Sequence, residues 1–241
     1  MKTIINTFKH NDLEVLEYTS SQAKKLLFLQ HGIYGKKEKV MNLLGVSFVK
    51  LGYHVVAIDA YKHGFRGEKP FINQDKDQAE LETMDVVEQT AFDIKALYEH
   101  YYQNFYPSVN IVGISMGGLI AYYLSTIVDN IDQLVALISS PKFLEAANYT
   151  FPKERQALYD NSEEVLNKVK AMDPSEKVKK MSFERLIMLN GIHDQVIPYT
   201  QSETFYHKHK ALNIIFKTYD AEHKITKAMH EDLIELLKEE F

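Results

Sequence analysis

The fold of this chain is decided by residues 109–118, which read VNIVGISMGG. The first half is an apolar, β-branched run of the kind that forms a buried strand. The second half is Gly-x-Ser-x-Gly, and a helix-like run follows from Leu119 to Val128. A serine between glycines at a strand-to-helix turn is typical of a nucleophile elbow, where Ser115 holds its hydroxyl clear of the backbone. Glycines suit this position because the turn is strained and crowded.

Strand-like and helix-like segments alternate on both sides of this elbow. We expect an antiparallel pair at the N-terminus and then single strands separated by helices, with a final amphipathic helix over 225–237. This alternation predicts an α/β fold with a mostly parallel central sheet of about eight strands and helices on both faces. The expected strands cover 3–8, 13–18, 26–29, 55–58, 109–114, 134–138, 186–189 and 214–216.

Composition narrows the class of protein. The chain has 241 residues, of which 45% are hydrophobic, and we expect one domain over 1–241 with a sizeable core. The net charge of −5 does not favour nucleic acid or an anionic membrane surface as a partner. Without cysteine there is no thiolate nucleophile or disulfide. We find no signal-peptide pattern and no apolar run long enough to span a membrane, so we expect a cytoplasmic protein.

One segment interrupts the alternation. Residues 142–183 are charged and helix-prone, with scattered apolar side chains. The segment is too long for a plain connection and too short for a domain of its own. We interpret it as a small helical cap inserted after the strand that follows the elbow. The alternative is an ordinary helical excursion at the edge of the sheet.

A serine hydroxyl needs a base and a carboxylate to act as a nucleophile at neutral pH. Asp194 follows the strand expected at 186–189, and His223 follows the last strand. Carboxyl ends of parallel strands meet at one edge of a sheet, where ligands bind in open α/β sheets. The order Ser115, Asp194, His223 therefore predicts a catalytic triad at that edge.

Other residues compete for these roles. Asp194 alone could be a helix cap or turn residue. Asp220 and Glu222 are rival acids, although both lie too close to His223 in sequence to come from a different strand end. His193 is a weaker alternative for the base. His207 and His209 do not have the spacing of a metal pair on one helical face, and we expect no metal site.

An oxyanion hole requires two backbone N–H groups aimed at the developing negative charge. Met116, directly after the serine, is expected to supply one. The other is expected from the loop 30–35, with Ile33 as the first choice and Tyr34 as the second. His31 in the same loop is interpreted as structural.

Four aromatic residues are candidates for the walls of the substrate pocket, and each could equally belong to the core. The loop 59–67, which follows the strand at 55–58, is expected to form a turn at the rim of the site. The aromatic candidates are Tyr34, Phe65, Phe143 and Phe151.

Taken together, these motifs resemble the α/β-hydrolase superfamily over nearly the whole chain. The resemblance rests on His31-Gly32, the Asp59 loop, the elbow at 113–118, Asp194 and His223. Within that superfamily the chain looks most like small bacterial serine esterases of the dienelactone-hydrolase and prolyl-oligopeptidase-like branch. The Asp59 loop departs from the common His-Gly-x-Ser-x-Gly pattern, because it reads HGFRG at 63–67.

The resemblance implies a carboxylesterase that needs no cofactor and acts on small esters with short acyl chains. A peptidase or amidase, or a thioesterase, would use the same triad. A binding protein without activity is a third alternative, since a fold does not fix a function. A dinucleotide site is disfavoured, because Ser115 stands where Gly-x-Gly-x-x-Gly requires its second glycine.

Overall fold

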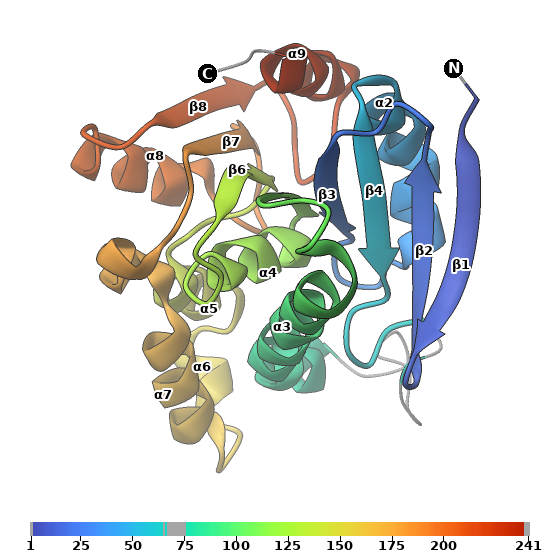
Figure 1. Ribbon diagram of the computed structural model, residues 1–241. Coiled ribbons are helices and arrows are strands. Elements are labelled where there is room, and N and C mark those ends of the chain that lie inside the picture. Colours follow the sequence, from blue (N-terminus) through green and yellow to red (C-terminus); the bar gives the residue numbers. More distant parts are fainter. Residues whose placement is uncertain (1, 65, 67–75, 239–241) are drawn as a thin grey trace.

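Eight strands of the chain pair into one sheet in the computed structural model, which describes residues 2–64, 66 and 76–238 (Figure 1). The strand order is β1-β2-β4-β3-β5-β6-β7-β8. β2 pairs antiparallel with both β1 and β4, and the remaining pairs are parallel. The strands are β1 Ile4–His10, β2 Leu13–Thr19, β3 Lys25–Gln30, β4 Tyr53–Ile58, β5 Val109–Ile114, β6 Ile131–Leu137, β7 Arg185–Gly191 and β8 Ile214–Tyr219.

The predicted α/β class and mostly parallel sheet are confirmed, including the antiparallel pair at the N-terminus. β1 and β2 fold back on each other at Asn11, which has a positive φ of 53°. Asparagine tolerates that left-handed conformation better than most residues, which explains its place in this turn.

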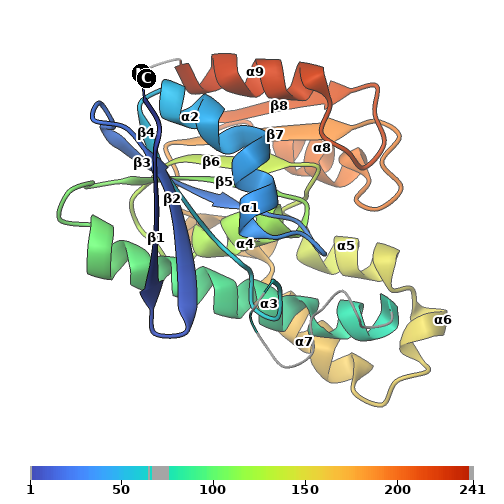
Figure 2. The same ribbon diagram turned by 90° about the vertical axis from the view of Figure 1, so that its right-hand side faces the viewer.

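Helices cover both faces of the sheet (Figure 2). α1, α2 and α9 lie against one face, and α3, α4 and α8 lie against the other. Their bounds are α1 Lys37–Val40, α2 Val46–Lys50, α3 Lys76–Leu97, α4 Met116–Leu124, α8 Tyr199–Lys208 and α9 Lys227–Lys238, with π-helical turns at Met41–Gly45 and Tyr98–Tyr102.

The central strands bury both of their faces. In β3, Leu26 and Phe28 pack into the core under α3 and α4, whereas Leu27 and Leu29 pack into the core under α1, α2 and α9. Side chains alternate across a strand, so a strand covered on both sides reads as a continuous apolar run. This is why β3 and β5 were recognisable from the sequence.

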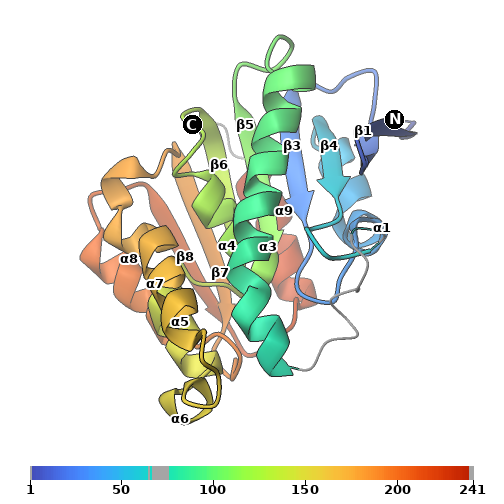
Figure 3. The ribbon, with the colours of Figure 1, turned by 90° about the horizontal axis from the view of Figure 1, so that it is seen from below.

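The 142–183 segment contains several helices and lies beside α3, on the same side of the sheet (Figure 3). Polar contacts join it to α3: Lys168 Nζ lies 2.7 Å from Asp85 Oδ1, and the hydroxyl of Tyr159 donates to Asp77 at 3.0 Å. The segment contains α5 Phe143–Thr150, α6 Lys153–Gln156, α7 Ser162–Met172 and the 3-10 turns Pro174–Glu176 and Val178–Lys180.

The helix after the elbow differs in extent from its prediction. It begins at Met116 and ends at Leu124, instead of covering 119–128. It begins early because the carbonyl of Ser115 accepts hydrogen bonds from the amides of Gly118 and Leu119 at 2.8 and 3.3 Å. Among the described residues, none of the helices combines the length and apolar character needed to cross a membrane.

Candidate active site

Ser115 sits in a sharp turn between β5 and α4. Its backbone has φ 54° and ψ −117°, a conformation that non-glycine residues adopt only under strain. The side chain is almost buried, with 8% of the residue exposed. The turn places the hydroxyl at the carboxyl end of the central strand, the position that the sequence predicted for a nucleophile.

Each glycine of the elbow allows a close approach that a side chain would block. A Cβ added to Gly113 would lie 2.0 Å from the carbonyl oxygen of Gly117. One added to Gly117 would lie 2.4 Å from the carbonyl oxygen of Gln30, and one added to Gly118 would lie 2.4 Å from Cβ of Ser139. These distances are far below van der Waals contact, so the motif is required by packing as well as by the turn.

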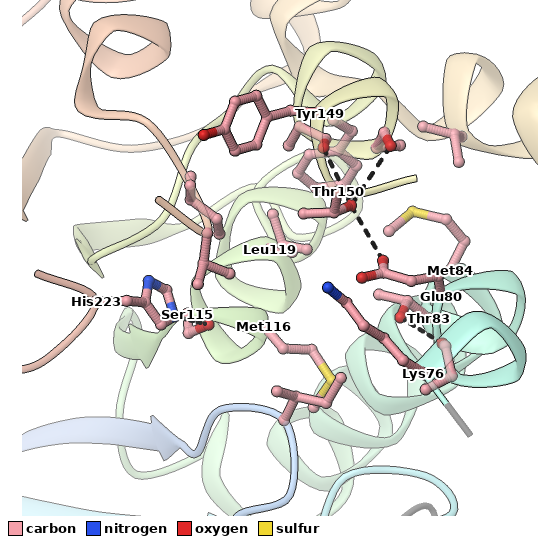
Figure 4. A pocket seen from close by; sticks show the side chains of 18 of the residues that line it. Lys76, Glu80, Thr83, Met84, Ser115, Met116, Leu119, Tyr149, Thr150 and His223 are labelled. Carbon is pink, nitrogen blue, oxygen red and sulfur yellow. Dashed lines mark hydrogen bonds between the residues drawn. The ribbon is translucent and has the colours of Figure 1, made fainter. Parts of the chain in front are cut away.

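Three side chains predicted to act together form a continuous hydrogen-bonded chain. Ser115 Oγ lies 2.8 Å from His223 Nε2, and His223 Nδ1 lies 2.7 Å from Asp194 Oδ2. A carboxylate can only accept, so the imidazole proton belongs on Nδ1 and Nε2 accepts from the hydroxyl. Figure 4 shows Ser115 and His223 side by side at one end of a pocket.

Both carboxylate oxygens of Asp194 accept hydrogen bonds. Its side chain is buried, and Oδ1 accepts the amides of Val196 and Ile197 at 2.8 and 2.9 Å. Oδ2 is thereby left for His223. The loop between β7 and α8 thus fixes the carboxylate in the orientation that a base requires.

The alternative acid and base lie outside this arrangement. His193 Nε2 bonds Asp220 Oδ1 at 2.9 Å, and both side chains are largely exposed, at 60% and 91%. Glu222 is exposed as well. The geometry therefore favours Asp194 and His223 over the rivals that the sequence left open.

The loop after β3 packs directly onto the elbow. A Cβ added to Gly32 would meet the carbonyl oxygen of Ile114 at 3.1 Å and Cβ of Ser115 at 3.3 Å. Ile33, the next residue, and Met116, the first residue of α4, both line the pocket next to Ser115. Their side chains border the same space as the nucleophile.

His31 holds this loop in place. Its Nε2 accepts the amide of Ala60 at 3.0 Å, and its Nδ1 lies 2.8 Å from the carbonyl oxygen of Gly32, to which it donates. Burial lowers the pKa of His31 to about 4, because a buried imidazole resists taking a charge. A neutral imidazole that cross-links β3 to β4 has a structural role, as expected.

A cavity of about 640 Å³ opens from Ser115 towards the 142–183 segment. Its walls are mostly apolar, and they include Tyr34 and Phe143 from the predicted set. Phe151 does not line it, because its ring packs against Tyr159 at a centroid distance of 5.9 Å and lies under the guanidinium of Arg155. Phe65 lies outside the described residues.

The far end of this cavity is polar, which sequence reasoning missed. Glu80 accepts a hydrogen bond from the hydroxyl of Thr150 at 3.1 Å, and Thr83 and Lys76 lie beside it (Figure 4). Burial raises the pKa of Glu80, and neither the Thr150 hydrogen bond nor the Lys76 charge fully offsets this. In the sequence Glu80 looks like any polar residue near a helix start, so only the contact with α5 reveals its position.

A buried ion pair beside the site was also missed. Lys37 Nζ lies 2.9 Å from Asp59 Oδ2, and Asp59 Oδ1 accepts the amide of Lys37 at 2.9 Å. Glu14 and Glu38 each lie 3.0 Å from the same ammonium. Burial alone would lower the pKa of Lys37, but the hydrogen bonds to the three carboxylates outweigh it and raise the pKa. Gly64 is needed here, because a Cβ on it would lie 2.2 Å from Asp59 Oδ2.

Comparison with known proteins agrees with this architecture. The chain is 23% identical over 201 residues to the Bacillus subtilis (strain 168) protein named "Putative esterase YitV", covering 80% of this chain and 77% of that one. The crystal structure of TT1662 from Thermus thermophilus superposes with a TM-score of 0.84 at 21% identity over 100% of both chains. The Pyrococcus furiosus esterase Pf2001 gives a TM-score of 0.66 at 19% identity, covering 98% of this chain and 92% of the other.

These structural likenesses show the fold, and the sheet order and elbow described above are those of an α/β-hydrolase. The expected resemblance to that superfamily is confirmed. A family model, the PGAP1-like alpha/beta domain, matches residues 72–230, well over half of the chain. The protein therefore belongs to the PGAP1-like alpha/beta domain family, with the α/β-hydrolase fold.

Proposed function

We propose that this protein is a serine carboxylesterase that hydrolyses small carboxylic esters through an acyl-enzyme. One observation carries the proposal: the unbroken hydrogen-bonded chain from Ser115 through His223 to Asp194, with contacts of 2.8 and 2.7 Å. The esterase name of the Bacillus relative supports the same reaction class. No cofactor takes part in the proposed chemistry.

The first step is acylation. His223 Nε2 takes the proton of Ser115 as its oxygen attacks the ester carbonyl, and Asp194 stabilises the imidazolium that forms. The amides of Ile33 and Met116 donate to the carbonyl oxygen as it gains negative charge. The imidazolium then gives the proton to the departing alcohol oxygen, and the C–O bond breaks.

In the second step, deacylation, water is the nucleophile and Ser115 is the leaving group. His223 takes a proton from a water molecule, which attacks the acyl group on Ser115, and the acid leaves with the serine oxygen reprotonated. The strained turn at Ser115 supports both steps, because it keeps the hydroxyl fixed between the imidazole and the oxyanion donors.

The acyl group occupies the 640 Å³ cavity, a volume within the usual range for small-molecule sites. Its apolar walls near Ser115 suit a short acyl chain. We assign the 142–183 segment, within a single domain, the role of a cap, because Phe143 and Thr150 of α5 form part of the cavity wall. Cap residues would thus set the acyl preference.

The proposal is tested with p-nitrophenyl esters of increasing acyl length and a fluorophosphonate probe. Ser115→Ala should lower kcat by roughly 10⁴–10⁶-fold and abolish labelling, as expected for a serine nucleophile. Ser21→Ala, an exposed serine in the β2–β3 connection, is the control and should retain activity. Near-full activity in Ser115→Ala, or a label mapped by mass spectrometry to another residue, would remove Ser115 from the mechanism.

Matched substrates separate the esterase from its alternatives. A butyrate ester, the corresponding thioester and the corresponding anilide share one acyl group, so their kcat/KM values compare leaving groups alone. We expect the ester to be hydrolysed far faster than the anilide. A higher value for the anilide would assign an amidase, and a higher value for the thioester a thioesterase.

A further inference from the structure

A second cavity, of about 510 Å³, also meets Ser115 and His223, and none of residues 142–183 lines it. It shares Ile33 and Tyr34 with the first cavity, so the two spaces join at the nucleophile. Its inner surface is apolar and comes from the ends of β5 and β6 and from the connection between β8 and α9. The apolar residues there are Ile114, Ile138 and Ile225.

The rim of this second cavity carries three lysines. Lys36 and Lys39 come from the start of α1, and Lys224 directly follows His223. All three are exposed, and among the described residues none of them has a carboxylate within ion-pair distance. The part of the cavity lining that the structure describes includes no aspartate or glutamate. We call these three lysines the basic rim.

The acids nearest in sequence do not neutralise the basic rim. Glu38 lies between two of its members, but its carboxylate is 3.0 Å from buried Lys37. Glu222 is exposed and does not line the cavity. The first cavity differs, because its cations are balanced: Arg155 pairs with Asp77, and Lys76 lies beside Glu80. The positive charge is therefore specific to one side of Ser115.

We propose that this cavity receives an anionic leaving group, a carboxylate or phosphate carried on the alcohol part of the ester. The inference rests on the proposed esterase function and deepens it. A carbonyl bound at Ser115 sends one substituent into each cavity. The apolar, capped side suits the acyl chain, and the open basic side suits an alcohol that must leave into water.

The size of the effect follows from the exposure of the lysines. Exposed ion pairs are individually weak and are screened by salt, so discrimination arises from the three charges acting together. We expect an anionic ester to be preferred by about tenfold in kcat/KM at low ionic strength. That preference should shrink as salt is added.

The experiment uses butyrate esters of three phenols whose para substituent is a CH2 group bearing a carboxamide, a carboxylate or a phosphate. The CH2 spacer keeps the phenol leaving groups similar. The variant K36Q/K39Q/K224Q should lose the preference for the anionic esters and keep its activity on the neutral one within about twofold. The carboxylate and phosphate substrates distinguish the two sources of negative charge.

The control variant is K24Q/K25Q/K50Q, which removes the same charge from exposed lysines at the opposite, amino-terminal ends of β3 and β4. It should keep the preference. If this control loses the preference equally, or if the wild-type protein shows none, the inference is overturned. A preference for only one of the two anions would identify that anion as the group that the second cavity binds.

A binding measurement tests this inference independently of the esterase proposal. In Ser115→Ala, affinities for the anionic and neutral phenols are measured by calorimetry, with no need for turnover. Tighter binding of the anionic phenols, if it is lost when the three lysines of the basic rim are also replaced, supports anion binding in the second cavity even if ester hydrolysis is absent. Equal affinities overturn the inference even if esters are hydrolysed.

Discussion

Asp194 and Asp220 each bond a histidine, but one of the two pairs is buried and the other is exposed. Asp194 is buried, receives two amides and orients His223 against Ser115. Asp220 is 91% exposed and bonds His193 at the surface. An exposed pair of this kind is screened and contributes little, whereas a buried carboxylate fixes both the position and the tautomer of its partner.

This contrast supplies a matched pair of substitutions. Asp194→Asn should lower kcat by roughly 10⁴-fold, because an amide NH2 facing Nδ1 favours the tautomer with the proton on Nε2. Asp220→Asn removes the same charge from the exposed pair and should leave kcat within about twofold. Steady-state kinetics with p-nitrophenyl butyrate measures both, with circular dichroism as the check on folding. Equal losses in the two variants would contradict the assignment of Asp194.

His31 makes stability depend on pH. Its pKa is about 4 in the folded chain against 6.5 when unperturbed, so below pH 6.5 the unfolded chain takes up a proton that the folded chain does not. Stability attributable to His31 is therefore full above pH 6.5 and falls as the pH drops towards 4. We expect wild type to lose roughly 2–3 kcal/mol more than His31→Gln between pH 7 and 4 in urea unfolding. Parallel pH profiles would exclude this role.

At the level of elements, the sequence predicted strands better than helix ends. β3 and β5 were found because strands buried on both faces are apolar throughout. The helix expected over 119–128 begins at Met116, since the turn at Ser115 already directs the backbone into it. At that start, Gly117 and Gly118 pack closely against Gln30 and Ser139, which are distant in sequence. Local patterns do not encode such contacts.

The Lys37–Asp59 pair joins the start of α1 to the end of β4, next to the proposed oxyanion loop. Lys37→Met would leave the side chain of Asp59, 4% exposed, without its cationic partner. Breaking one side of a buried ion pair costs roughly 3–5 kcal/mol, and we expect a loss of that size in urea unfolding. Lys39→Met, two positions later on an exposed side chain, should change stability by less than about 0.5 kcal/mol. A loss below about 1 kcal/mol in Lys37→Met would contradict the importance of the pair.

For the whole molecule, strand order decides which residues meet. The sheet brings residues 31–33, 115, 194 and 223 to one edge, and the last three could be placed there from the sequence because each follows a recognisable strand. The cavity walls were not predictable in the same way. Glu80 and Thr150 meet because α7 packs against both α3 and α5, and the basic rim forms because α1 faces the β8–α9 connection. Such juxtapositions depend on helix packing, which has no local sequence signature.

The proposed base is attached to the outermost strand. Among the strands that the structure describes, β8 pairs with β7 alone, all of its residues are at least partly exposed, and His223 follows it by four positions. Lys217 and Tyr219 both bond Asp232 of α9, so strand and helix should detach as one unit. If this unit frays before the rest unfolds, catalysis fails while most secondary structure survives. We expect activity to disappear at a lower urea concentration than far-UV ellipticity, and β8 amides to exchange with deuterium sooner than those of β5. If activity and ellipticity are lost at the same urea concentration, the edge strand β8 is as stable as the central strands.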